Sequence, residues 1–544
     1  MTSYKDNPLN IKEIQFRLNK CADIIRVLQD RNDVENTEYE EIKTQTDKYI
    51  NNEVILMFDN SLFIKQYIIN PKEDGSIFKT YKHDKYDSAQ IVAGIDRVLL
   101  LLLVKYDNKY YIAFNEGVYY ADVLKWGSFQ LLSVDSSALE LATATDTETA
   151  FKCVYNQYLN SFYLVCSVNG SGSPSIPLMK LLEYKSSTAD GNGSWSWNTI
   201  ALSGLSSLSD LSGLYYDISI INFDENSKMY NKYPNGGLVC SGYTSSDKFL
   251  ISQIGLLEYN KETRSITSQK WEKLSCETDT LYAPQHVKYY SISQSIVQTS
   301  TVEDSEIETS SCVLATVGHT LNTTNIPYIL QTGKAYALVN FKLTTSGSTE
   351  TIEIKIDIKW QNITLPKIDE EHFNKYLWKT ITYDKDHNEF IMGYDFYKDN
   401  DKVDKTNLNH KMVTLNVSPS INDDNSTVSF SISYTIDKEY DYINSMCLLF
   451  DVNRDEIMAA TTNPDNVVKT KIRNNNQWND KGCYSNIKTE SIPISLSSCK
   501  ESENRVYMLT VKTDGDRYYV YILSYDISRD WVDDIDNYYT IKTK

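Results

Sequence analysis

The sequence predicts an all-β protein with a short α-helical segment near its N-terminus. The 544 residues include 41 Tyr and 16 Phe, and aromatic and β-branched residues suit a half-buried pleated surface. A pattern of aromatic residue, polar turn and second aromatic or apolar residue occurs at Tyr383–Phe390, Tyr155–Phe162 and Phe450–Ile457, with a weaker copy at Phe223–Tyr230. Tyr155 and Phe223 are 68 residues apart and Tyr383 and Phe450 are 67 apart. This pattern predicts a hairpin repeated in a unit of several strands.

From residue 91 onward the chain divides into seven similar blocks, each with strands, hairpins and often a terminal Trp. In the first block we expect turns at Asp107-Asn108 and Glu116-Gly117. A later strand that ends in Tyr recurs at Leu182–Lys185, Leu257–Asn260 and Leu523–Asp526. About four short strands per unit and a closing aromatic are typical of a β-propeller blade. We therefore predict a β-propeller of about seven blades (six to eight) over residues 91–544. The alternative is a series of β-sandwich domains.

Residues 53–90 are predicted to form a strand hairpin and a linker, because two apolar runs within 54–69 flank a polar turn and a polar stretch follows. A propeller has to close its ring. We expect the strands near residues 54–69 to complete the last blade, beside its end at Tyr538–Thr543.

Residues 1–52 are predicted to form an N-terminal helical docking or oligomerisation segment. Residues 8–30 form the main helix, with apolar residues at alternating steps of three and four, as in a coiled-coil seam. A second helical stretch is expected at about 33–51. A helical hairpin packed on the main body is the alternative to docking. The seam consists of Ile11, Ile14, Leu18, Cys21, Ile25 and Leu28. We expect Ile11, Ile14, Leu18, Ile25 and Leu28 to make the docking or oligomerisation contacts.

Composition and charge argue against several classes of function. The net charge of −19 repels a phosphate backbone, so nucleic-acid binding is not expected. The nine Cys have no C-x-x-C spacing and are predicted to be buried apolar residues in a reducing compartment. We expect no signal peptide and no membrane span, since the longest apolar run, Val98 to Val104, is too short.

The motifs support architecture more than catalysis. Thr188–Trp195 resembles the Asp-box of sialidases and other β-propellers, which is a structural turn between the outer strands of a blade; Asn192 stands where the motif has Gly, and we expect it to tolerate a left-handed backbone. A sialidase would also imply an arginine triad and an Arg-Ile-Pro motif, which the sequence lacks.

The six His show no metal-binding spacing, and the polar loop at Asp399–Asp404 lacks the Gly and Glu of an EF-hand. The acidic pairs Glu370-Glu371 and Asp533-Asp534 are expected to be solvated charges. No phosphate-binding or nucleophile motif occurs. We therefore expect no enzymatic activity, no cofactor and no metal.

The Tyr-, Asn-, Lys- and Ile-rich composition and the all-β architecture resemble those of bacteriophage tail, baseplate or nozzle proteins built on propellers. This resemblance implies a non-catalytic virion structural protein, made in the host cytoplasm, that assembles with other tail proteins or with itself through its N-terminal helices. One alternative is a receptor- or carbohydrate-binding propeller, in which exposed Tyr and Trp stack on sugars of the host surface. A second alternative is a polysaccharide hydrolase with a site in the central channel.

Overall fold

The fold is that of a computed structural model, which describes the strands and their connections in the following ranges. These are residues 64–69, 82–83, 89–120, 123–142, 151–169, 177–200, 217–243, 250–260, 262–274, 288–294, 300–302, 305–321, 330–365, 377–395, 412–437, 445–451, 455–462, 468–474, 476–484, 492–499, 505–514 and 517–526.

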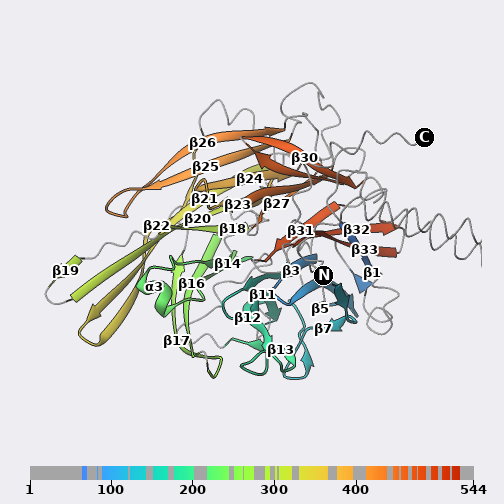
Figure 1. Ribbon diagram of the computed structural model, residues 1–544, viewed down its shortest axis with the longest axis horizontal. Helices are drawn as coiled ribbons and strands as arrows, with labels where there is room; N and C mark the ends of the chain where they lie inside the picture. The colour runs from blue at the N-terminus through green and yellow to red at the C-terminus, as the bar shows by residue number, and fades with distance from the viewer. Residues whose placement is uncertain are drawn as a thin grey trace, which may run out of the picture.

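Within these residues the strands form seven antiparallel meanders of four strands each, here called units 1 to 7 (Figure 1). Unit 1 contains β3 (Ala89–Ala93), β4 (Arg97–Tyr106), β5 (Lys109–Tyr120) and β6 (Val123–Trp126). Unit 2 contains β10 (Phe151–Asn156), β11 (Ser161–Asn169), β12 (Pro177–Ser186) and β13 (Trp195–Thr199). Unit 3 contains β14 (Asp217–Ile221), β15 (Gly237–Tyr243), β16 (Leu250–Asn260) and β17 (Ser265–Leu274).

The later units have the same order of strands. Unit 4 contains β18 (Lys288–Gln294), β20 (Ser305–Leu321), β21 (Leu330–Ser346) and β22 (Thr349–Asn362). Unit 5 contains β23 (Leu377–Asp384), β24 (Glu389–Asp395), β25 (Val413–Ile421) and β26 (Val428–Asp437). Unit 6 contains β27 (Ser445–Asp451), β28 (Glu456–Thr462), β29 (Val468–Asn474) and β30 (Gln477–Tyr484). Unit 7 contains β31 (Ile492–Ser498), β32 (Arg505–Asp514), β33 (Arg517–Asp526) and β1 (Ile64–Ile69). Among the short strands, β2 (Lys82–His83) pairs with β4, β7 (Gln130–Leu131) with β5 and β19 (Ser300–Val302) with β20, and β8 (Ser133–Val134) pairs with β9 (Ser137–Ala138).

The first strands of the seven units follow one another in a closed circuit. β3 contacts β10, β10 contacts β14, β14 contacts β18, and the series continues through β23 and β27 to β31, which contacts β3 again. Each unit therefore lies between two others. A row of independent β-sandwiches would not return to its first member in this way.

The expected pairing between a strand near residues 54–69 and the last unit is confirmed. β1 pairs antiparallel with β33, with Ile64 opposite Tyr525 and Ile69 opposite Val520, and the two strands lie side by side in Figure 1. The partner is β33, whereas the residues expected as partners, Tyr538–Thr543, lie outside the described residues. One sheet thus joins the two ends of the described chain, about 450 residues apart in the sequence.

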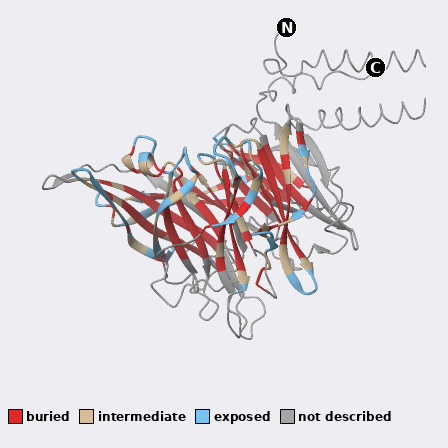
Figure 2. Cartoon of the chain, turned by 90° about the horizontal axis from the view of Figure 1, so that it is seen from below, coloured by how far each residue is buried: buried red, intermediate tan, exposed pale blue. Residues whose placement is uncertain are grey.

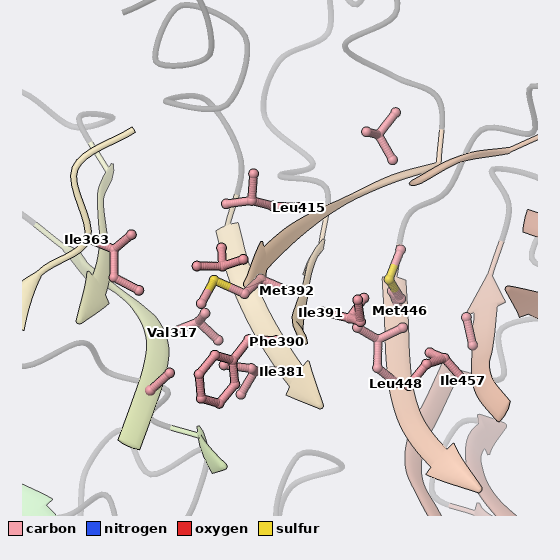
Figure 3. Close-up of a cluster of buried hydrophobic side chains, with 14 of the residues drawn as sticks. Val317, Ile363, Ile381, Phe390, Ile391, Met392, Leu415, Met446, Leu448 and Ile457 are labelled. Atoms are coloured by element: carbon pink, nitrogen blue, oxygen red, sulfur yellow. The ribbon is translucent and has the colours of Figure 1, made fainter. Parts of the chain in front are cut away.

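The apolar core lies between successive units. Figure 3 shows one cluster in which Val317 of unit 4, Phe390 of unit 5 and Ile457 of unit 6 belong to the same buried group. Other clusters join units 1 and 2, units 2 and 3, units 3 and 4, and units 1 and 7. Figure 2 shows the buried residues along the strands and the exposed ones at turns and strand ends. Such a unit cannot bury its two faces alone, which explains why the units form a circuit.

Three of the four hairpins predicted from the repeated pattern are confirmed. Tyr155 pairs with Phe162 and Tyr383 pairs with Phe390 across their hairpins, with ring centroids 4.8 and 5.6 Å apart. Each Tyr hydroxyl donates a hydrogen bond to an Asn in the turn, Asn160 at 3.0 Å or Asn388 at 2.8 Å. Both Asn residues have a left-handed backbone, which Asn adopts more readily than most residues. Phe450 pairs with Ile457 in the third copy.

The weak fourth copy, Phe223–Tyr230, was wrongly predicted as a hairpin. Ser227 instead accepts a hydrogen bond from the Tyr230 amide and caps the short helix α3 (Lys228–Lys232). The buried carboxylate of Glu308, in unit 4, accepts hydrogen bonds from the amides of Lys228 and Met229. These acceptors satisfy the first amides of the helix and favour it over a hairpin turn.

The predicted N-terminal helices and the boundary of the docking segment at residue 52 lie outside the described residues. The seam residues Ile11, Ile14, Leu18, Ile25 and Leu28 lie there as well. In the part of the chain that the structure describes, no helix is long and apolar enough to cross a membrane. Six cysteines whose side chains the structure describes form no disulfide and are buried, as expected: Cys153, Cys166, Cys240, Cys312, Cys447 and Cys499.

Candidate binding cleft between units 1 and 2

A cleft of about 370 Å³ lies where the outer part of unit 1 faces unit 2. This volume is near the lower end of the range for ligand pockets, about 300–1,000 Å³. Aromatic rings and polar groups both line it, which is the usual chemistry of a binding site. The lining residues are Phe114, Glu116, Val118, Lys125, Trp126, Gly127, Ser128 and Gln130 of unit 1 and the loop after it, with Tyr184 and Trp195 of unit 2.

The unit 1 wall follows from strand geometry. Phe114, Glu116 and Val118 alternate along β5, so their side chains lie on one face of the sheet. Lys125 is opposite Val118 on β6, and Gln130 is opposite Phe114 on β7. Residues opposite each other on neighbouring strands share a face, which brings these five side chains to the surface that faces unit 2.

The unit 2 wall is a group of aromatic rings on β12 and β13. Tyr184 lies next to Trp195 and Trp197, with ring centroids 5.3 and 4.9 Å away. Phe114 of unit 1 meets Tyr184 edge to face at 5.6 Å. Such contacts fix the rings in position. The predicted Asp-box orients Trp195, because it forms the turn that precedes β13.

The Asp-box turn has the predicted place but a different backbone. It connects β12 and β13, the outer strands of unit 2, as the resemblance implied. Asp190 accepts hydrogen bonds from the Thr188 hydroxyl at 2.5 Å and the Asn192 amide at 3.1 Å, and these bonds lower its pKa to about 2. The left-handed residue is Gly191, with φ of +78°, so the expectation for Asn192 was wrong.

A three-residue ionic cluster adjoins the cleft through Glu116. Arg97 of β4 donates to Asp96 through Nε at 3.0 Å and Nη2 at 2.8 Å, and its Nη1 pairs with Glu116. The guanidinium also lies over the ring of Trp195, 3.8 Å from the centroid. Burial lowers the pKa of Arg97, but the bonds and charges of Asp96 and Glu116 outweigh this effect and raise it overall. Arg97 is therefore a permanent cation that is paired with two carboxylates and covered by an aromatic ring.

Glu116 is the carboxylate that lines the cleft. Its side chain is 26% exposed, whereas that of Arg97 is 8% exposed. Burial and the nearby charge of Glu116 raise the pKa of Tyr184. Glu116 is held by Arg97 and still reaches the cleft, which leaves it able to accept hydrogen bonds from a ligand.

The next junction has a related arrangement. There Tyr259 of unit 3 donates a hydrogen bond to Glu183 of unit 2 at 3.3 Å, and in the first junction Tyr184 of unit 2 lies near Glu116 of unit 1. Lys185 pairs with Glu183 at 3.1 Å, and the hydroxyls of Tyr163 and Tyr259 are 3.0 Å apart. The Glu183 side chain is only 4% exposed. Protein groups occupy this junction, so Glu183 is less accessible to a ligand than Glu116.

Sequence reasoning missed the cleft because it placed Glu116-Gly117 in a turn. β5 runs unbroken through both residues. Gly117 is needed for close packing instead: a Cβ there would lie 3.0 Å from Leu124 and 3.1 Å from Trp126. The turn predicted at Asp107-Asn108 is confirmed, with both residues left-handed as a two-residue hairpin turn requires.

The other polar candidates from the sequence form no site in the described residues. His387 Nδ1 lies 2.8 Å from a carboxylate oxygen of Asp384, which also accepts from Arg473 at 2.9 Å, so this cluster joins units 5 and 6. No group of three or more potential metal ligands occurs among the described residues. The acidic pairs Glu370-Glu371 and Asp533-Asp534 and the loop Asp399–Asp404 lie outside them.

Comparisons with known proteins identify no family. No family model and no curated protein matches the sequence. Among solved structures, the chain is similar to AofleA from Arthrobotrys oligospora, with 9% identity over 77% of this chain and 89% of that one and a TM-score of 0.33. It is also similar to a Penicillium chrysogenum α-L-arabinanase complexed with arabinobiose (8% identity, 69% and 92% coverage, TM-score 0.31) and to the Hadza microbial sialidase Hz136 (8%, 85% and 68%, 0.33).

These similarities are too low to carry a functional argument. They include two glycoside hydrolases, so they do not support the expectation that the chain has no enzymatic activity.

Proposed function

We propose that the chain is a seven-bladed β-propeller that binds carbohydrate in the cleft between its first two blades. The closed circuit of first strands and the pairing of β1 with β33 support the propeller. On this proposal units 1 to 7 are the blades, and β1 is the outermost strand of the last blade, which fastens the ring.

The observation that carries the binding function is the composition of the cleft. Rings of Tyr184, Trp195 and Phe114 lie beside the acceptor carboxylate of Glu116 and the polar side chains of Lys125 and Gln130. A sugar presents apolar C–H faces and a dense set of hydroxyls, so it needs aromatic surface and hydrogen-bonding groups side by side. Tyr and Trp supply such amphipathic surface.

Binding is favoured over hydrolysis at this cleft. Glycosidases use two carboxyl groups about 5–10 Å apart across the scissile bond. Glu116 is the one carboxylate among the lining residues, and Arg97 already pairs with both it and Asp96. A carboxylate that is paired with a guanidinium is well placed to accept hydrogen bonds from a ligand.

The virion role predicted from composition stays a prediction, and it is compatible with glycan binding. A propeller carried on a phage tail would use such a cleft to contact a host surface glycan. The N-terminal segment that would attach it, residues 1–52, lies outside the described residues.

The test is a glycan array followed by calorimetric titration of the strongest ligand. We expect Glu116→Gln to weaken glycan binding by at least tenfold, because the group that accepts hydrogen bonds from the ligand hydroxyls loses its charge. A tenfold change in Kd corresponds to about 1.4 kcal/mol. Glu258→Gln is the matched control. Glu258 lies on the third strand of unit 3, outside the cleft, and accepts from Ser268 at 2.6 Å. Equal weakening by both variants, or no glycan binding at all, would overturn the proposal.

A further inference from the structure

We infer that the cleft selects neutral glycan termini and rejects those that carry a carboxylate or sulfate. This inference rests on the proposed function and concerns the chemical class of the ligand at the same site. The first reason is that Arg97, the cation that would suit an anionic sugar, is already paired with two carboxylates and an aromatic ring. Asp96 holds it through two hydrogen bonds, Glu116 through a third, and Trp195 covers its face.

Arg97 also cannot easily turn toward a ligand. Its side chain is 8% exposed. To bind an anion in the cleft it would have to leave Glu116 and uncover Trp195, and the half-buried Glu116 carboxylate would lose its counter-ion. The cleft therefore offers an anionic ligand no released guanidinium.

The second reason is the charge that the ligand meets. Glu116 is an acceptor when ionised, so it binds hydroxyl donors and repels a carboxylate or sulfate placed beside it. Lys125 is the cation among the lining residues, and it lies exposed on β6, where water and salt screen its charge. The contact at Glu116 is less exposed and so less screened.

The cleft volume adds a limit on size. About 370 Å³ is close to the minimum for a ligand pocket. We therefore expect the cleft to hold a short glycan terminus, whose hydroxyls face Glu116 and whose C–H face packs against the aromatic wall.

The experiment compares matched pairs of glycans on the intact chain. Each pair consists of one neutral oligosaccharide and the same oligosaccharide with one terminal hydroxyl sulfated or its terminal hydroxymethyl group oxidised to a carboxylate. We expect the neutral member to bind at least about tenfold more tightly, because two like charges in contact reduce the affinity by several factors of ten. Glu116→Gln should reduce this ratio, and Lys125→Gln, a change at an exposed position, should keep or increase it.

The dependence on salt distinguishes repulsion of an anionic ligand within the cleft from repulsion by the net charge of the whole chain. The net charge of −19 also repels anions, but this effect falls as the screening length shrinks from about 10 Å at 0.1 M to about 3 Å at 1 M salt. A ratio that persists at 1 M salt in the native chain and falls in Glu116→Gln supports the inference. A ratio that vanishes at 1 M salt, or an anionic member that binds as tightly as the neutral one, overturns it. Failure of every glycan to bind would overturn the proposed function as well. Thermal unfolding of each variant shows whether it is folded. If Glu116→Gln does not fold, the ratio of affinities measured with Lys125→Gln still tests the inference.

Discussion

The pair formed by Lys471 and Asp437 allows a quantitative test of how units 5 and 6 are joined. Lys471 lies on β29 of unit 6 and Asp437 ends β26 of unit 5, and their Nζ and Oδ2 atoms are 2.9 Å apart. Both side chains are 0% exposed. At the same junction β26 pairs in parallel with β30 through Ile436 and Asp437. We therefore expect this ion pair to be part of the contact between the two units.

Replacing Lys471 by Met should destabilise the fold by about 3–5 kcal/mol, because the Asp437 carboxylate then stays buried without its counter-ion. Lys385 provides a matched control. It pairs with Asp455 of unit 6 at nearly the same distance, 2.8 Å, but the two side chains are 54% and 47% exposed. Lys385→Met should therefore cost only about 0–1 kcal/mol.

The measurement is urea unfolding followed by tryptophan fluorescence and by circular dichroism, since coincidence of the two probes tests whether one transition is involved. The double variant Lys471→Met, Asp437→Leu should regain most of the lost stability, as apolar replacement of a buried pair often does. The reasoning is refuted if Lys471→Met costs no more than Lys385→Met. It is also refuted if the double variant is as unstable as the single one.

Three further predictions concern closure, turns and pH. Deleting residues 64–69 removes β1 and exposes the edge of β33, so we expect a lower melting temperature and aggregation; a chain that melts unchanged would show that β1 does not close the fold. Asn388 is left-handed and accepts from Tyr383, so Asn388→Ala should cost about 1–2 kcal/mol in urea unfolding and Asn388→Gly less, because Gly keeps the backbone without strain; equal losses would contradict this. Burial raises the pKa of Tyr184 and Tyr259, so these groups ionise in the unfolded chain first, and the unfolding midpoint should fall as pH rises above about 10. A midpoint independent of alkaline pH would contradict that assignment.

The repeat itself was readable from the sequence because its signals are local. The cross-strand pairs Tyr155–Phe162 and Tyr383–Phe390 lie within eight residues of chain, and hairpins depend on just such short-range chemistry. The weak copy failed for a non-local reason. Glu308, far along the chain, caps α3 and decides for a helix where the pattern resembled a turn.

The cleft could not be predicted in the same way. Its ionic cluster joins Arg97 and Glu116 to rings at Tyr184 and Trp195, and only the packing of unit 1 against unit 2 brings them together. Glycine was also ambiguous in the sequence: Gly117 serves close packing within a strand and not a turn. The Asp-box was the one readable pointer to this region, since it positions Trp195.

The central claim is that the cleft between units 1 and 2 is a carbohydrate site. The most direct measurement is an experimental structure of the chain with the tightest glycan from the array. We expect the sugar in this cleft, with a hydroxyl within about 2.5–3.0 Å of a Glu116 carboxylate oxygen and its C–H face against the aromatic wall of Tyr184 and Trp195. A glycan bound elsewhere on the molecule, with this cleft empty, would contradict the claim.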